Sequence, residues 1–501
     1  MVTLRYNSFY LVSNGIVKLA ISLISVPLLI RFLGLERYGV WAVILSLVAI
    51  TSLLEFGIPT AMTNKFAELR SLDDREAIKD NYSSSLLCLL TLALITFVIL
   101  WSTIPNVITF LFKKYNHPDE VINTLRVISF IVPINFLNHW VSAIMAGFQR
   151  YDLHTSIDFI SNLFLQTGTI ILAINKNLVI IAFWWIIINL GIFIGHLYLL
   201  RKYILVLRPK GKITVDTIVK LIRFGTTQWF SSFGSVLFGY ADRILINYFL
   251  GPAVAGMYSA ATSIVVKINN LSAIPIEVIP PAISEARSLI LTPRIHQIFL
   301  RATKVNGLGV ISLTSLIIFW ADLLAILIVG QENGRIVAKL LVNLSLIYGT
   351  YSLNAAGFYT AVGIGKPIIN AKWGMLSGLL TILLLITLTP VYGLQGAVWA
   401  NAAYILTLMI NLSVASEIKI TILQYAKSFF PSLILVIFWR IVAILYQPTL
   451  QSFIWSIFIF LSLLTISLLI IADKELRCDI VQIPIGLFSR IRLAFTADRK
   501  N

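Results

Sequence analysis

Several charged residues lie inside long apolar stretches of the sequence, and five of them could carry chemistry: Lys18, Glu55, Asp242, Arg243 and Lys267. A charge at membrane depth costs about 2.5–3.5 kcal/mol on insertion scales, so each one needs a partner or a wet cavity. The three cations would suit a cavity that binds an anionic group, and we predict that they contact the substrate. The alternatives are a lysine that reaches the membrane interface and an internal ion pair.

The two carboxylates suit a different chemistry. Burial favours the protonated form of an unpaired carboxylate, so Glu55 could exchange a proton and is a predicted coupling site. A salt bridge to Lys18 is the alternative. Asp242 precedes Arg243, and neighbours on a helix do not face each other. Asp242 is therefore a second coupling candidate, for which a structural role on another helix is the favoured alternative.

No metal or nucleotide motif accompanies these charges. The sequence contains neither His-Glu-x-x-His nor Cys-x-x-Cys, and the segment 363–367 (GIGKP) lacks the spacing and the Ser or Thr of a nucleotide-binding loop. We expect no catalytic residue, no metal and no cofactor, and hence no enzyme. Any transport would be driven by gradients, membrane potential or substrate concentration.

The composition predicts an integral membrane protein. Of the 501 residues, 58% are hydrophobic and only 12% are charged, about half the charged fraction of a soluble protein. The net charge of +17 does not indicate nucleic-acid binding, because the basic residues lie between apolar stretches.

The fold class predicted from the apolar stretches is an all-α polytopic membrane protein with about fourteen transmembrane helices. Each stretch has about the 20 residues needed to cross the hydrocarbon core. The expected spans are 9–31, 39–61, 82–104, 127–147, 157–175, 178–200, 224–249, 256–280, 305–329, 337–362, 373–390, 395–415, 429–446 and 452–472.

The distribution of basic residues predicts the orientation. With the N-terminus in the cytoplasm, the cytoplasmic segments hold 27 of the 39 Lys and Arg residues and the external segments hold 8. Cytoplasmic loops carry the excess of Lys and Arg, so both termini should be cytoplasmic. The external connection near 105–126 is short and carries no evident functional residues.

An internal repeat divides the spans. Residues 32–72 align without gaps with 249–289, with 11 identities in 41 positions that include Gly34 on Gly251 and Gly39 on Gly256. The offset of 217 places span 1 on span 7, so each half holds six spans with the same orientation. The expected parts are an N-lobe (1–200), a basic cytoplasmic linker (201–223), a C-lobe (224–415), an extra helix pair (416–472) and a cytoplasmic tail (473–501).

The repeat also places Glu68 and Arg70 on Glu285 and Arg287. These residues would lie at the cytoplasmic mouth of each lobe, where they could form a gate. Ordinary solvated helix ends are the alternative.

Three motifs carry a family resemblance. They are PLLIRFLGLERYGVWAVILSLVAITSLLEFG at 27–57, DRIL at 242–245 followed by FLG at 249–251 and GMY at 256–258, and GKP at 365–367 with YGLQGA at 392–397. In this order they resemble the bacterial polysaccharide flippases, the O-antigen and lipid-linked oligosaccharide flippases of the multidrug/oligosaccharidyl-lipid/polysaccharide (MOP) superfamily.

The resemblance implies a flippase that moves undecaprenyl-diphosphate-linked oligosaccharide units to the outer leaflet of the bacterial inner membrane, for O-antigen, capsule or exopolysaccharide. Its partners would be that glycan, membrane lipids and the polysaccharide polymerase machinery, and no nucleic acid. Two lobes would alternate around a cationic cavity, where Lys18, Arg243 and Lys267 suit the diphosphate.

Two alternatives remain at this point. An ion-coupled small-molecule exporter of the multidrug (MATE) branch would share the lobes but should have acidic cavity residues. A membrane-embedded polysaccharide polymerase or ligase would have a similar composition but usually has a long external loop.

Overall fold

The computed structural model describes residues 21, 24–204, 211–277 and 279–429. Within these ranges the regular structure is helical, with no strand. A short apolar helix, Ile24–Leu33, comes first. The helices that follow are α2 (Leu35–Ile50), η1 (Thr51–Glu55), α3 (Ile58–Ser71), α4 (Arg75–Leu111), α5 (Pro118–Ser129), α6 (Ile131–Gly147), α7 (Tyr151–Ala173), α8 (Leu178–Tyr203), α9 (Val215–Leu250), α10 (Pro252–Ala273), α11 (Ile279–Ser288), α12 (Thr292–Phe319), α13 (Ala321–Ser352), α14 (Ala355–Gly363), α15 (Ile368–Asn401), η2 (Ala402–Leu408), α16 (Met409–Glu417) and α17 (Ile422–Lys427).

The structure confirms the predicted class of an all-helical membrane protein. Seven helical stretches in the described ranges are long and apolar enough to cross a membrane. Their outward sides remain apolar, as on α8, where Phe183, Ile187 and Ile194 are each more than half exposed. An apolar surface along a helix of this length suits contact with lipid. The predicted count of fourteen is not confirmed, because most of the first span and the last two spans lie outside the described residues.

The bundle has two ends, the turn face and the basic face. At the turn face, consecutive spans are joined by tight turns, two of which pass through Gly34 (φ 82°) and Gly251 (φ 94°). Glycine suits these positions because other residues rarely adopt such φ angles. The opposite end, the basic face, carries the connections 72–74, 148–150 and 289–291, together with the end of α8 and the start of α9.

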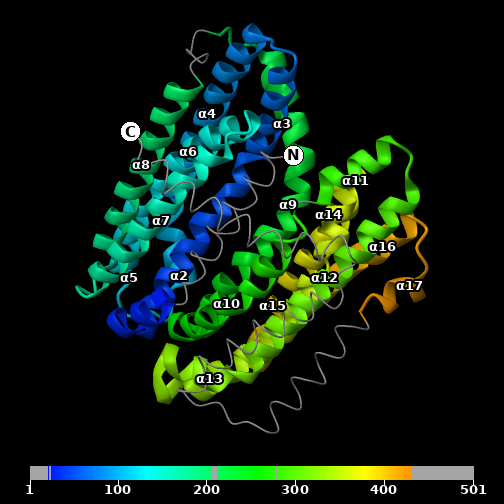
Figure 1. The fold of residues 1–501 in the computed structure, drawn as a ribbon. Helices are drawn as coiled ribbons and strands as arrows, with labels where there is room; N and C mark the ends of the chain where they lie inside the picture. The colour runs from blue at the N-terminus through cyan, green and yellow to red at the C-terminus, as the bar shows by residue number, and fades with distance from the viewer. Residues whose placement is uncertain (1–20, 22–23, 205–210, 278, 430–501) are drawn as a thin grey trace, which may run out of the picture.

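Two lobes make up the bundle, with α2–α8 in the N-lobe and α9–α16 in the C-lobe. In Figure 1 they lie side by side, meet at the lower end and diverge toward the upper end, with α9 between them. One apolar core, which includes Trp41, Ile128 and Val265, continues through both lobes toward the turn face. Toward the basic face it gives way to two separate cores, around Trp140 in the N-lobe and Phe299 in the C-lobe.

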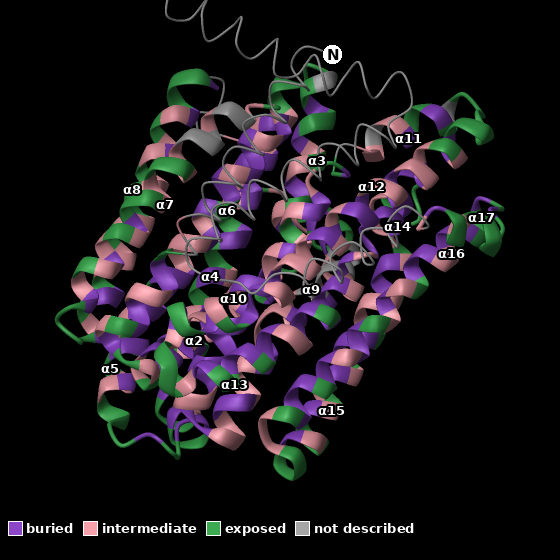
Figure 2. Cartoon of the chain, turned by 60° about the horizontal axis from the view of Figure 1, so that its bottom comes forward, coloured by how far each residue is buried: buried purple, intermediate pink, exposed green. Residues whose placement is uncertain are grey.

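The buried residues follow this division. Figure 2 shows them along the inner sides of α2, α6 and α10, while exposed residues cover the outer side of α8. Helix α9 crosses between the lobes. Its first half joins the N-lobe core through Leu221, and its second half joins the shared core through Ile246.

The same contacts occur in both lobes. A Cβ added to Gly147 would lie 2.6 Å from the Phe66 Cβ, and one added to Gly363 would lie 2.7 Å from the Ile283 Cβ. Phe66 and Ile283 are 217 positions apart, the offset of the sequence repeat, and the two glycines are 216 positions apart. The predicted repeat is therefore a repeat of structure, in which α3 packs on α6 as α11 packs on α14.

Several predicted spans are interrupted in the structure. In the stretch 256–280, α10 ends at Ala273 and α11 begins at Ile279, and in the stretch 305–329, α12 ends at Phe319 and α13 begins at Ala321. The stretch 39–61 was expected to be one span, but α2 and η1 end at Glu55 and α3 begins at Ile58. Between them, Phe56 (φ 50°) and Gly57 (φ 68°) are left-handed and interrupt the helical hydrogen bonds. A local apolar pattern does not reveal this break, because both sides of it are apolar.

Two connections are also shorter than expected. Helix α4 extends to Leu111 and α5 begins at Pro118, so the connection expected near 105–126 is limited to 112–117. Helices α8 and α9 extend into the expected linker and leave 204–214 between them. At both connections, the helices continue beyond the apolar residues that defined the predicted spans.

We predict that Gly147→Ala and Gly363→Ala each destabilise their lobe by about 1–3 kcal/mol, because the added methyl group meets a packed helix. The thermal unfolding midpoint of the purified protein in detergent should fall in both variants. Gly191→Ala on α8 is the matched control, since its Cβ would meet no atom within 4 Å. Three equal midpoints would contradict this packing.

Candidate functional site

Arg243 lies on α9 where the two lobes meet. Its Nη1 donates to the Gly239 carbonyl (2.8 Å) and its Nη2 to the Thr262 hydroxyl (3.1 Å). The guanidinium is also within electrostatic range of the Tyr38 phenol, which comes from α2 of the N-lobe. Its Nε is buried and has no hydrogen-bond partner among the described residues. Arg243 thus places a fixed positive charge between the lobes.

Asp242, the neighbour of Arg243, faces the C-lobe interior. It is 2% exposed, and its Oδ2 accepts from the Tyr258 hydroxyl (2.5 Å) while Oδ1 accepts from the Arg243 backbone N–H (2.7 Å). Asn401 in turn donates to the Tyr258 oxygen (3.0 Å). These bonds join α9, α10 and α15, which is the structural arrangement expected of a buried carboxylate.

Lys267 lies on α10, five residues after Thr262, so it is about 7.5 Å farther along the helix toward the basic face. It is half-buried. None of the ion pairs found within the described residues involves Lys267. Lys18, the third predicted cation, lies outside the described residues.

Glu55 ends η1 at the break in the second span. It is 5% exposed, and its Oε1 lies 2.7 Å from Nδ1 of His139 on α6. The His139 side chain is half exposed. Beside the break, the Trp229 indole N–H of α9 donates to the Leu53 carbonyl (2.7 Å). The structure therefore pairs Glu55 with a histidine at a point where the backbone is irregular.

The four predicted gate residues lie near the ends of α3 and α11, toward the basic face. Arg70 donates to the carbonyl of Phe148 (2.6 Å) at the end of α6, and Arg287 donates to the carbonyl of Ile364 at the end of α14. Glu68 pairs with Lys65 (3.0 Å) on its own helix. Glu285, like Arg287, is exposed near the end of α11. Each arginine therefore satisfies a helix C-terminus within its own lobe.

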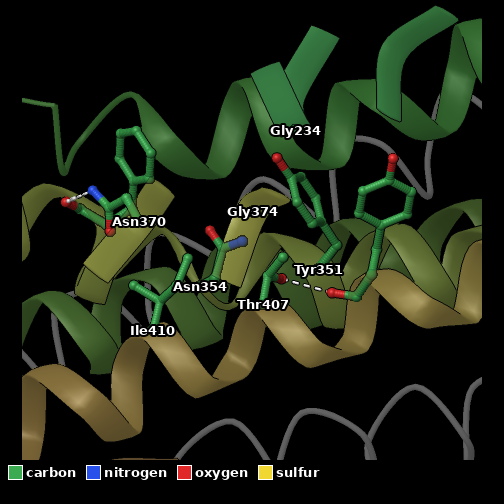
Figure 3. A pocket seen from close by; sticks show the side chains of 9 residues that line it. Gly234, Tyr351, Asn354, Asn370, Gly374, Thr407 and Ile410 are labelled. Atoms are coloured by element: carbon green, nitrogen blue, oxygen red, sulfur yellow. Dashed lines mark hydrogen bonds between the residues drawn. The ribbon is translucent and has the colours of Figure 1, made fainter. Parts of the chain in front are cut away.

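A small pocket lies within the C-lobe, with about 330 Å³ of empty space, part of which opens to solvent. Figure 3 shows it between Gly234 of α9, Tyr351 and Asn354, Asn370 and Thr407. No charged side chain lines it. The Asn370 Oδ1 is buried without a hydrogen-bond partner in the described part of the chain. The pocket is thus chemically unlike the cationic surface around Arg243.

Comparison with known proteins identifies the family. The family model for polysaccharide biosynthesis proteins matches residues 4–287, more than half of the chain. This chain belongs to that family. No curated protein sequence matches it.

Solved structures show the fold of this polysaccharide biosynthesis protein. The lipid II flippase MurJ in an inward closed conformation is similar with a TM-score of 0.71 and 15% identity, over 91% of this chain and 97% of that chain. An inward-facing multidrug resistance MATE transporter of the MOP superfamily is similar with a TM-score of 0.61 and 15% identity, over 80% and 98%.

A MOP superfamily transporter from Pyrococcus furiosus, described as having a binding pocket of reverse polarity, gives a TM-score of 0.58 at 14% identity, over 83% of this chain and 95% of that chain. The polysaccharide biosynthesis protein therefore has the MOP transporter fold and spans nearly the full length of these relatives. At such identities the similarity concerns the fold alone.

Sequence reasoning missed several residues around the predicted ones. Tyr258 and Asn401 hold Asp242, and His139 holds Glu55. Tyr258 is 16 positions from Asp242, Asn401 is 143 positions from Tyr258, and His139 is 84 positions from Glu55. Only the first of these spacings is short enough to suggest a neighbouring helix. His139 was recognisable as a polar residue in an apolar span, but nothing in its neighbourhood indicates Glu55.

We predict that Tyr258→Phe destabilises the protein by about 1–3 kcal/mol, because Asp242 loses a buried hydrogen-bond donor. The measurement is the thermal unfolding midpoint in detergent. Tyr392→Phe, at a tyrosine that is 55% exposed, is the control for loss of a hydroxyl. If both variants have the same unfolding midpoint as the wild-type protein, the hydrogen bond from Tyr258 to Asp242 does not contribute to stability.

Proposed function

We propose that this polysaccharide biosynthesis protein is a flippase for undecaprenyl-diphosphate-linked oligosaccharide units, which it moves from the cytoplasmic to the outer leaflet of the bacterial inner membrane. The observation that carries the proposal is the placement of Arg243 between the two lobes of a MOP fold. The family and the similarity to a lipid II flippase support a lipid-linked glycan as cargo.

The charges suit a diphosphate. Arg243 and Lys267 lie on adjacent helices, and we propose that both contact the charged head group. Lys267 follows Thr262, the Arg243 partner, by about 7.5 Å along α10 and about 140° around it, so the two cations would contact different sides of that group. An arginine binds phosphate through several N–H groups, and an ammonium group adds a point charge. Lys18 would add a third cation from the first span. The diphosphate belongs to the lipid carrier, so we propose that it is the group that these cations recognise.

The membrane potential can drive this movement. Each elementary charge is worth about 2.3 kcal/mol per 100 mV, and a diphosphate with about two negative charges moves downhill toward the outside of an inside-negative membrane. A coupling ion is therefore not needed thermodynamically. If a proton is coupled, Glu55 is the better of the two predicted sites, because a carboxylate–imidazole pair can exchange a proton whereas Asp242 is fully engaged inside the C-lobe.

The orientation follows from the basic residues. We propose that the basic face is cytoplasmic, with both termini on that side, so that the lobes diverge toward the cytoplasm. The N-lobe (1–200) and C-lobe (224–415) would be the two moving parts, with 416–472 as an added helix pair and 473–501 as a tail. Glu68, Arg70, Glu285 and Arg287 would then lie at the cytoplasmic mouth, where gating remains a proposal.

A MATE-like exporter is the second candidate, because the fold is also similar to a multidrug resistance transporter. An organic cation needs an accessible carboxylate between the lobes. The two carboxylates predicted as coupling sites are buried, and each is hydrogen-bonded to another side chain. The charge around Arg243 therefore favours an anionic cargo.

We predict that Lys18→Ala, Arg243→Gln and Lys267→Ala each reduce glycan-lipid transfer at least tenfold without lowering the amount of folded protein. Transfer would be measured in proteoliposomes as time-dependent exposure of undecaprenyl-diphosphate-linked oligosaccharide in the opposite leaflet. Lys339→Ala on the exposed side of α13 removes the same charge and should leave transfer unchanged. Full activity of Lys18→Ala, Arg243→Gln and Lys267→Ala would refute the cationic cavity.

A further inference from the structure

The outer side of α8 carries a continuous stripe of exposed, largely apolar residues (Figure 2). The members recur every three or four positions, so they share one face of the helix. The stripe extends for about 27 Å along the axis, close to the thickness of about 30 Å of the hydrocarbon core. It therefore marks where lipid acyl chains lie against the N-lobe. Its residues are Ile180, Phe183, Ile187, Leu190, Ile194 and Tyr198.

Cations and tyrosines gather at the end of the stripe that points to the basic face. Lys202 Nζ lies 5.8 Å from the centre of the Tyr198 ring and 5.3 Å from the centre of the Tyr203 ring. The guanidinium carbon of Arg150, at the start of α7, lies 5.2 Å from the Tyr203 ring centre. Arg201 is exposed and follows Tyr198 by three residues, so it continues the stripe. We call these five residues the α8 cluster.

The α8 cluster lies at the depth of the lipid head groups. Arg201 and Lys202 follow the end of the stripe by about 4.5–6 Å. The head-group layer adds about 5–8 Å to each side of the hydrocarbon core. Tyrosines are enriched at this boundary, where the ring is in contact with lipid and the hydroxyl with water. The cations are therefore level with the lipid phosphates.

Two of the cations carry charge that the protein does not neutralise. Neither Arg201 nor Lys202 enters an ion pair within the ranges that the structure describes. The face of an aromatic ring attracts an ammonium group but does not cancel its charge. Lys202 is thus held near two rings and can still donate charge-assisted hydrogen bonds to a phosphate.

The corresponding end of the C-lobe is different. Helix α16 ends the sixth span of that lobe, as α8 does in the N-lobe. There, Lys366 forms an ion pair with Glu417, and the segment 413–424 contains no aromatic residue. Basic residues at the end of a span therefore do not by themselves produce such a cluster, which is a feature of the N-lobe.

We propose that the α8 cluster binds the head group of an anionic diacyl phospholipid, whose acyl chains lie along the stripe of α8. The phosphate contacts Arg201 and Lys202, and Arg150 adds a third positive charge. A zwitterionic lipid carries a cation of its own, which reduces its attraction to these groups. The site requires only a membrane, so it does not depend on the proposed transport. Its assignment to the cytoplasmic leaflet follows from the proposed orientation.

Native mass spectrometry tests the site, because it counts the lipids bound to the purified protein. The protein in detergent would receive equal amounts of dioleoylphosphatidylglycerol and dioleoylphosphatidylcholine. Wild-type protein should retain at least fivefold more of the phosphatidylglycerol. The double variant Arg201→Gln, Lys202→Gln should lose most of this preference, because each cation near a membrane surface contributes about fivefold to binding of an anionic lipid.

The matched control is the double variant Lys212→Gln, Lys220→Gln. It removes the same charge from exposed lysines before and at the start of α9, toward the same face of the bundle, and should keep the wild-type preference. Equal losses in the two double variants would show general attraction of anions and would overturn the site. No preference in wild-type protein, or an unchanged preference in folded Arg201→Gln, Lys202→Gln protein, would also overturn it.

A further variant tests the cluster at constant charge. Tyr198→Leu keeps an apolar side chain at the interface but removes one of the two rings near Lys202. The preference for phosphatidylglycerol should fall two- to threefold. Tyr392→Leu is the control, because Tyr392 is 55% exposed and Tyr198 is 60% exposed. Equal preferences in the two tyrosine variants would contradict the role of the ring in positioning Lys202.

Discussion

The close approach of α2 and α10 at Gly39 and Gly256 is the contact on which the arrangement of the molecule depends. It brings two backbones together where a single methyl group would keep them apart. Because the contacting surfaces are repeat equivalents, the contact also sets how one lobe is rotated relative to the other. With the lobes joined at this end, the shared core forms at the turn face and the lobes diverge toward the basic face.

The position of the cations follows from this arrangement. Arg243 is held by Gly239 and Thr262 on the C-lobe side and has Tyr38 of the N-lobe beside it, one residue before Gly39. A buried guanidinium needs its N–H groups satisfied, and a carboxylate facing it would neutralise it as an anion site. The neighbouring Asp242 attracts Arg243 electrostatically, but its two oxygens accept hydrogen bonds from the Tyr258 hydroxyl and the Arg243 backbone N–H rather than from the guanidinium.

Much of this fold could be predicted from the sequence, because long apolar stretches, basic loops and a 217-residue repeat are local or additive signals. The repeat predicted that Gly39 and Gly256 are equivalent residues, but it did not predict that they contact each other. The break at Phe56 and Gly57 and the Glu55–His139 pair could not be predicted. They depend on which helices pack together, and apolar composition does not specify packing partners in a membrane. Lys18 lies outside the described residues, so its place near Arg243 stays a prediction.

The central claim is that the space between the lobes receives an anionic lipid diphosphate. The most direct measurement compares two cargos in the same proteoliposomes under an imposed inside-negative potential: an undecaprenyl-diphosphate-linked oligosaccharide and a lipophilic organic cation. The account predicts transfer of the glycan lipid that accelerates as the potential increases, with no protein-dependent movement of the cation. Protein-dependent export of the cation without transfer of the glycan lipid, by protein shown to be folded, would contradict it.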